Sequence, residues 1–125
     1  MRKQFLIVLR HAPYGRLDAA EAVRHLNGAL SNGLDARLLL LDDGVYLARA
    51  GQEPAPGWTG LSSALEQALA AGVRDAERPD RIVVAHQPSL ATRGLSSRDL
   101  VAGCQIVDDE AAAGLLAAAD ATLIY

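Results

Sequence analysis

Residues suited to proton transfer and anion binding gather in three short segments of this sequence. The segments are Arg10-His11-Ala12-Pro13-Tyr14-Gly15-Arg16, Asp42-Asp43-Gly44-Val45-Tyr46 and His86-Gln87-Pro88-Ser89. Histidine can exchange a proton near neutral pH, while arginines and the free amides at a helix N-terminus can hold an anion. We therefore predict a ligand-binding site, with no assigned catalytic residue, formed by Arg10, His11, Tyr14, Arg16, Asp42, Asp43, His86 and Arg93.

Each segment follows a largely apolar stretch of strand length that is bounded by turn residues. These stretches are Phe5 to Leu9, Ala36 to Leu41 and Arg81 to Ala85. The carboxyl ends of parallel strands share one edge of a sheet, where ligands usually bind, so the three segments should be neighbours. Arg10 and Arg16 favour an anion there, whereas Asp42 and Asp43 repel it, so we expect weak binding that strengthens as the pH falls. An open alternative is that these residues only keep the loops solvated.

Helical patterns separate the strands. Leu17 to Leu30 and Leu61 to Ala71 carry apolar residues at helical spacing, and Asp18 and Ser63 each begin a capping-box pattern. The elements expected further on are a short helix capped at Ser96, a strand from Cys104 to Val107, a helix from Asp108 to Ala119 and a strand from Ala121 to Tyr125. This alternation predicts one α/β domain over residues 1–125, with three α/β/α layers and a mainly parallel sheet of about five strands.

Composition and charge argue against several classes of protein. The 12 basic and 15 acidic residues are scattered, with a formal net charge of −3, so we expect no direct binding to nucleic acid. The apolar runs are too short to cross a bilayer and no leader pattern opens the chain, so we expect a cytoplasmic protein without membrane contact. Asp42-Asp43 lacks the ligand spacing of a metal site, and we expect neither a metal nor a cofactor.

The single cysteine and one histidine are expected to lie outside the site. Cys104 cannot form an internal disulfide, and its position at the start of a predicted strand makes it a partly buried thiol at the edge opposite to the three segments. His25 falls on the polar side of the first helical pattern, where we expect it to be solvated.

Motifs spread over nearly the whole chain carry a family resemblance. They are Ala12-Pro13-Tyr14-Gly15, Asp43-Gly44-Val45-Tyr46, Gly51-Gln52-Glu53-Pro54, Ser89 to Leu95 and Ala119 to Tyr125. In this order and spacing they resemble the DsrE/DsrF/TusC family of sulfur-relay proteins, most closely its DsrF/TusC branch. The resemblance implies a role in passing persulfide sulfur between proteins, for tRNA thiolation or sulfur oxidation, within oligomers.

The resemblance also implies where a sulfur-carrying cysteine would stand. Many family members have a cysteine seven positions before the arginine of Arg93-Gly94-Leu95, and this sequence has His86 there. We therefore expect an accessory subunit that lacks independent catalytic activity and forms homo- or hetero-oligomers with related small α/β subunits. The expected contacts between subunits are Tyr46, Leu47 and the loop from Gly51 to Trp58.

Two alternatives compete for the same residues. Leu9-Arg10-His11-Ala12 and Val83 to Pro88 are similar to the two signatures of histidine phosphatases. That resemblance implies a phosphorylated His11, a phosphate held by Arg10 and Arg93, transferring oxygens stabilised by His86, and Asp42 or Asp43 as the acid. The second alternative is a module that binds a small anion without chemistry.

Overall fold

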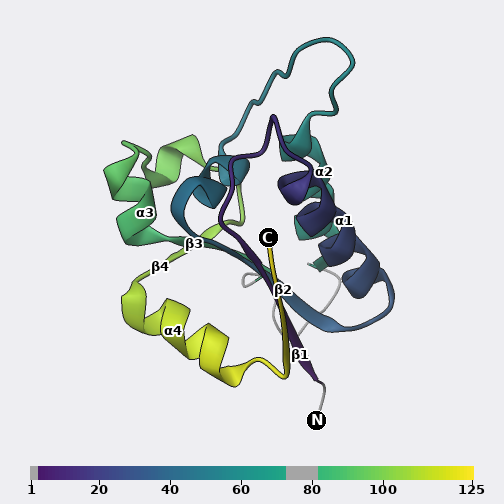
Figure 1. Ribbon diagram of the computed structural model, residues 1–125, viewed down its shortest axis with the longest axis vertical. Coiled ribbons are helices and arrows are strands. Elements are labelled where there is room, and N and C mark those ends of the chain that lie inside the picture. Colours follow the sequence, from purple (N-terminus) through teal and green to yellow (C-terminus); the bar gives the residue numbers. More distant parts are fainter. Residues whose placement is uncertain (1–2, 73–81) are drawn as a thin grey trace.

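The computed structural model describes residues 3–72 and 82–125 of the chain. In chain order its elements are β1 (Gln4–Leu9), α1 (Asp18–Ser31), β2 (Asp35–Leu40), the 3-10 helix η1 (Asp42–Ala48), α2 (Leu61–Gly72), β3 (Val83–His86), α3 (Gln87–Thr92), the 3-10 helix η2 (Ser97–Asp99), β4 (Gln105–Val107), α4 (Asp109–Ala118) and β5 (Ala121–Ile124) (Figure 1). The predicted strands are confirmed, although the expected start of the third strand at Arg81 lies outside the described residues.

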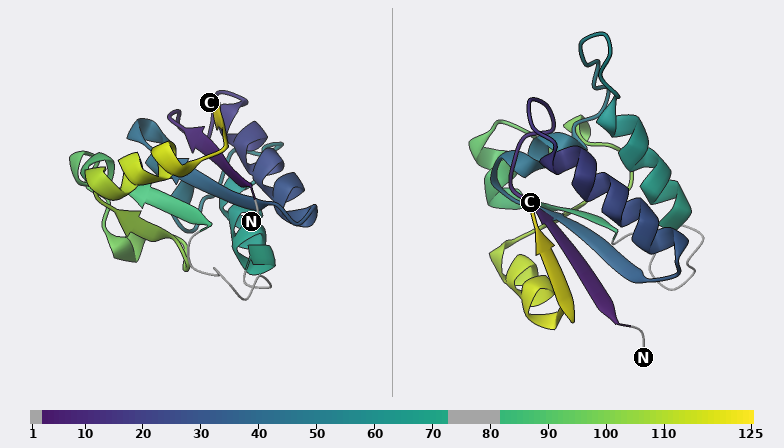
Figure 2. Two further views of the ribbon diagram at one scale, coloured as in Figure 1. Left: turned by 90° about the horizontal axis from the view of Figure 1, so that it is seen from below. Right: turned by 45° about the vertical axis from the view of Figure 1, so that its right-hand side comes forward.

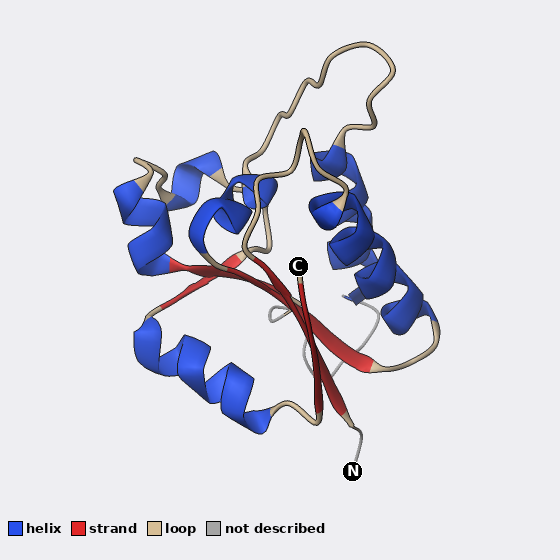
Figure 3. Ribbon diagram, in the orientation of Figure 1, coloured by secondary structure: helices blue, strands red, loops and turns tan. Residues whose placement is uncertain are grey.

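The five strands form one parallel sheet in the order β4-β3-β2-β1-β5. Helices lie on both of its faces, so the predicted three-layer α/β/α architecture is confirmed (Figure 3). In a parallel ladder every carboxyl end points the same way, so the ends of β1, β2 and β3 lie along one edge of the sheet.

Side chains alternate between the two faces because a strand repeats every two residues. On one face, Ile7 and Leu38 are fully buried within the main core, together with residues of α1 and α2. On the other face, Leu6, Leu39 and Val84 form a smaller core with Ala112 of α4. Figure 2 shows α1 and α2 on one side of the sheet and α4 on the other. The second face therefore has a thinner helical cover than the first.

Two predicted capping boxes are wrong. The N-cap of α1 is Leu17, and the Asp18 carboxylate accepts a hydrogen bond from Arg16 Nε at 2.7 Å, because the guanidinium competes for the oxygen that would cap the helix. The helix α2 begins at Leu61, which places Ser63 inside its first turn. By contrast, Asp108 caps α4 by accepting from the Ala111 amide at 2.8 Å, as its position indicated.

The segment that follows β3 was expected to be a loop and is a helix. Gln87–Thr92 forms α3, with Pro88 in its first turn, where the missing N–H of proline costs no helical hydrogen bond. His86 is the last residue of β3 and Ser89 lies in α3. Within residues 3–72 and 82–125, none of the helices has both the length and the apolar character needed to span a bilayer.

Candidate functional site at the carboxyl edge of the sheet

The three polar segments meet at the carboxyl edge of the sheet. Arg10 Nε donates to Asp42 Oδ2 at 3.0 Å, which joins the end of β1 to the start of η1. Arg93 Nε donates to Asp43 Oδ1 at 2.9 Å, which joins the same turn to the end of α3. The structure thus brings together residues from three segments that are far apart in the chain.

Gly44 explains why the turn after β2 lies so close to β1. Gly44 is buried, and a Cβ atom at this position would collide with the carbonyl group of Leu9. The Leu41 amide donates to the Leu9 oxygen at 3.0 Å, which holds the two strand ends together. Asp42, just before the turn, has a φ of 53°, in the left-handed region that non-glycine residues rarely adopt. The hydrogen bonds of Asp42 to Arg10 and to Ser89 stabilise that conformation.

A chain of hydrogen bonds fixes the His86 imidazole. Ser89 Oγ lies 2.7 Å from His86 Nδ1 and accepts from the Asp42 amide at 2.9 Å, and His86 Nε2 lies 2.6 Å from Asp109 Oδ1. For a neutral imidazole, the consistent arrangement has the Ser89 hydroxyl donating to Nδ1 and Nε2–H donating to the Asp109 carboxylate. Both ring nitrogens are therefore occupied by protein groups.

Ser89, His86 and Asp109 are the residue types of a hydrolytic triad, but the geometry does not provide a nucleophile. Ser89 is buried, with 6% of its surface exposed, and its oxygen already contacts the Asp42 amide and the His86 ring. A nucleophilic hydroxyl must reach the reacting carbon of a substrate. We therefore interpret the three residues as a structural connection between η1, β3, α3 and α4.

Removing the Ser89 hydroxyl should cost about 1–3 kcal/mol of unfolding free energy, because the Asp42 amide and His86 Nδ1, which are part-buried in these hydrogen bonds, would lose their partner. Ser89→Ala can be compared with Ser63→Ala by urea denaturation, since Ser63 is exposed on α2 and its loss should change stability by less than about 0.5 kcal/mol. Equal changes in unfolding free energy for the two variants would show that the Ser89 hydrogen bonds contribute nothing to stability.

The other predicted site residues make different contacts. Arg16 pairs with Asp18, and this hydrogen bond lowers the pKa of the Asp18 carboxyl. Tyr14 donates its hydroxyl to Gln52 Oε1 at 2.6 Å and packs edge-on against Trp58, with the ring centroids 6.4 Å apart. These contacts tie the loop after η1 to the loop after β1.

Gln52 is a residue whose role the sequence did not reveal. Its side-chain amide donates to the carbonyl oxygens of Leu47 at 2.8 Å and Arg49 at 2.9 Å, while its oxygen accepts from Tyr14. The position of Gln52 within the Gly51-Gln52-Glu53-Pro54 motif was the available signal. Leu47, expected at a subunit contact, is fully buried in the core of its own domain, so that expectation was wrong.

The two remaining histidines differ from each other. His11 is half-buried, and within the described part of the chain its Nδ1 atom is buried without a hydrogen-bond partner. Such an atom costs stability unless a ligand or a water satisfies it, which keeps His11 a candidate for binding. His25 was expected to be solvated and is not, because it stacks on Tyr125 at 5.7 Å between centroids and hydrogen-bonds the Tyr125 hydroxyl.

The charges at the edge are largely compensated. Arg10, Arg16 and Arg93 each have an aspartate oxygen within 3.0 Å. A bound anion would compete with these carboxylates, so the weak anion binding expected from the sequence stays a prediction. The histidine-phosphatase alternative gains no support, because the arginines that would clamp phosphate are paired and both nitrogens of His86 are engaged.

Cys104 lies far from this edge, as predicted. It precedes β4, at the amino-terminal end of the strand, and packs against the main core. Burial raises the pKa of its thiol to about 12. Because the thiolate is the nucleophile in sulfur chemistry, this cysteine is poorly suited to accept sulfur at neutral pH.

The parallel sheet with a polar carboxyl edge defines a small three-layer α/β protein, and comparisons with known proteins specify its family. The model of the DsrE/DsrF-like family matches residues 3–125. The chain is 30% identical to uncharacterized protein MJ0989 of Methanocaldococcus jannaschii over 105 residues, which cover 82% of each chain. It is 33% identical to uncharacterized protein MK0008 of Methanopyrus kandleri over 102 residues, which cover 80% of this chain and 75% of that protein.

A solved structure extends the comparison to the fold. The crystal structure of the YchN protein from E. coli matches with a TM-score of 0.82 and 28% sequence identity, and the match covers 100% of both chains. This protein belongs to the DsrE/DsrF-like family.

Proposed function

We propose that this protein is an accessory subunit of an intracellular sulfur-relay system and does not itself carry sulfur. Membership of the DsrE/DsrF-like family supports a place in sulfur transfer. Within that proposal, the chain acts in the cytoplasm, assembles with copies of itself or with related small α/β subunits, and serves tRNA thiolation or sulfur oxidation as a relative of the DsrF/TusC branch.

The observation that carries the proposal is the state of Cys104. Its thiol is the single one in the sequence, and burial raises its pKa to about 12. A relay cysteine needs a thiolate that a partner protein can reach. Cys104 does not meet the first requirement, and it is only partly exposed where it packs against the core at the amino-terminal end of β4.

The second support is the identity of His86, at the carboxyl edge of the sheet. By the resemblance to the family, His86 stands where many members have a cysteine, and it is held there by Ser89 and Asp109. An imidazole with both nitrogens engaged can position neighbouring groups but cannot form a persulfide. The edge would then serve as a docking or anion-holding surface for a sulfur-carrying partner.

The test is sulfur transfer from a cysteine desulfurase and cysteine, followed by intact-mass analysis. Wild-type protein should gain no sulfur atom, whereas His86→Cys should gain one, because the new thiol lies at the edge where the family resemblance places the carrier. Ser97→Cys is the control, since it adds an exposed thiol on η2 outside the edge cluster. A stable gain in wild-type protein that Cys104→Ser abolishes would overturn the proposal.

A further inference from the structure

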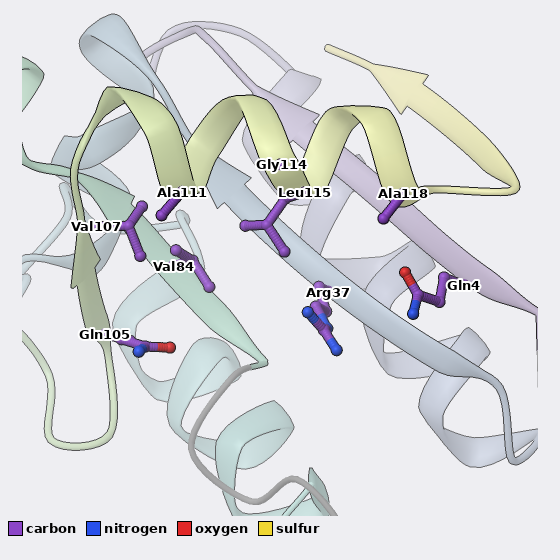
Figure 4. Close-up of a pocket in the computed structure, with 9 residues that line it drawn as sticks. All are labelled: Gln4, Arg37, Val84, Gln105, Val107, Ala111, Gly114, Leu115 and Ala118. Atoms are coloured by element: carbon purple, nitrogen blue, oxygen red, sulfur yellow. The ribbon is translucent and has the colours of Figure 1, made fainter.

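A cavity of about 380 Å³ lies under α4, on the second face of the sheet. It is lined by polar side chains from the amino-terminal half of the sheet, Gln4, Arg37 and Gln105, and by apolar side chains that include Val84, Val107 and Leu115 (Figure 4). Its volume falls at the lower end of the range for small-molecule sites, about 300–1,000 Å³. None of the predicted site residues at the carboxyl edge lines it.

The sequence of the strands explains why the cavity is polar on one side. On the face that α4 covers, β1 presents Gln4 and then Leu6, and the neighbouring β2 presents Asp35, Arg37 and then Leu39. The polar residues therefore occupy the amino-terminal half of this face and the apolar residues the carboxyl half.

The sequence of α4 explains why space remains. The helix turns Ala111, Gly114 and Ala118 toward the cavity, and these small residues leave room between helix and sheet (Figure 4). A Cβ atom added at Gly114 would have no heavy atom within 4 Å. A larger residue would therefore fit at this position without a steric clash.

Two carboxamides of the lining have hydrogen-bonding capacity that the described residues do not use. The half-buried carboxamides of Gln4 and Gln105 make no side-chain hydrogen bond to residues 3–72 or 82–125. Arg37 is 9% exposed, and its Nε atom lies 3.9 Å from Asp35 Oδ1. The cavity thus presents a buried cation between two amides, opposite an apolar wall.

We propose that this cavity binds a small molecule with one carboxylate and a short apolar body. A guanidinium matches the planar geometry of a carboxylate, and the two carboxamides add donors and acceptors beside it. Val84, Val107 and Leu115 would contact the apolar body. Asp35 lies close enough to repel a second negative charge, so a monoanion fits better than inorganic phosphate.

Isothermal titration with hexanoate, benzoate, the neutral amides of both acids, and inorganic phosphate tests the proposal on the full chain. We expect the two carboxylates to bind, the amides to bind roughly tenfold or more weakly, and phosphate to show no binding that Gly114→Leu removes. Gly114→Leu should abolish carboxylate binding by filling the cavity, whereas Gly114→Ala should retain it. Circular dichroism should show both variants folded, because alanine and leucine favour a helix over glycine.

A second pair of variants keeps the test independent of α4. Gln105→Leu should weaken carboxylate binding by roughly tenfold, and Gln67→Leu, at an exposed position on α2, should leave it unchanged. The proposal is overturned if wild-type protein binds neither carboxylate at millimolar concentration. It is equally overturned if acid and amide bind alike, or if folded Gly114→Leu binds as wild type does.

Discussion

Gly44→Ala should lower the free energy of unfolding by about 3 kcal/mol or more, because the new methyl group would meet backbone atoms that cannot move aside. An ideal Cβ at this position lies 2.7 Å from the Leu9 carbonyl carbon, 3.3 Å from the Arg10 amide nitrogen, and closer still to the Leu9 oxygen. Leu9 is the last residue of the interior strand β1 and Arg10 follows it, so relief of the clash requires η1 to shift as a whole. A shift of η1 would also separate Asp42 and Asp43 from their arginines.

Gly28→Ala is the matched control for this substitution. Gly28 lies in the last turn of α1, and a Cβ there has no heavy atom within 4 Å. Alanine should stabilise the helix by about 0.5–1 kcal/mol. Urea denaturation followed by circular dichroism measures both variants. If Gly44→Ala proved as stable as Gly28→Ala, the close packing of η1 on β1 would be wrong.

Cys104 should react with iodoacetamide about a thousandfold more slowly in the folded protein than in the urea-unfolded chain at neutral pH. Burial raises the pKa of its thiol from the usual 9.0 to about 12, so far less thiolate is present at any pH below 9. The rate in the folded protein should keep rising above pH 9, where the unfolded chain levels off. A folded rate within about tenfold of the unfolded rate would show an accessible, ionisable thiol and would weaken the proposed function.

The same pKa shift predicts a loss of stability in alkali. Below pH 9 the thiol is protonated in both the folded and the unfolded state, so it has no effect on their balance. As the pH rises from 9 toward 12, the unfolded chain loses this proton while the folded protein keeps it, and the free energy of unfolding falls. Cys104→Ala should flatten this fall in urea denaturation. Tyr125, whose pKa burial also raises, is present in both proteins and cancels in the comparison.

The sequence by itself determined the order of elements and the family. Apolar runs of strand length alternate with helical patterns, and this local periodicity depends only on neighbouring residues. Because all the strands are parallel, it also placed the Arg10, Asp42 and His86 segments at one edge. The position of Cys104 at the start of a strand was enough to put it at the other edge.

The local rules failed where other side chains compete for the same atoms. Asp18 has the right type and spacing for a helix cap, but Arg16 takes its carboxylate. His25 has the spacing of a solvated residue, but the Tyr125 ring, 100 positions away in the chain, covers it. Only the second outcome depends on a residue distant in the chain, since Arg16 lies two positions before Asp18.

Only the tertiary structure decided which groups meet. The pairs Arg10–Asp42 and Arg93–Asp43 are separated by 32 and 50 positions in the chain. They can form because β2 lies between β1 and β3 in the sheet. They also require Gly44, whose missing side chain lets η1 pack directly on the Leu9 backbone. The cavity under α4 likewise depends on the strand order, which places Arg37 of β2 between Gln4 of β1 and Gln105 of β4. Strand order and register arise from packing of the whole sheet, so no single segment of sequence could have determined them.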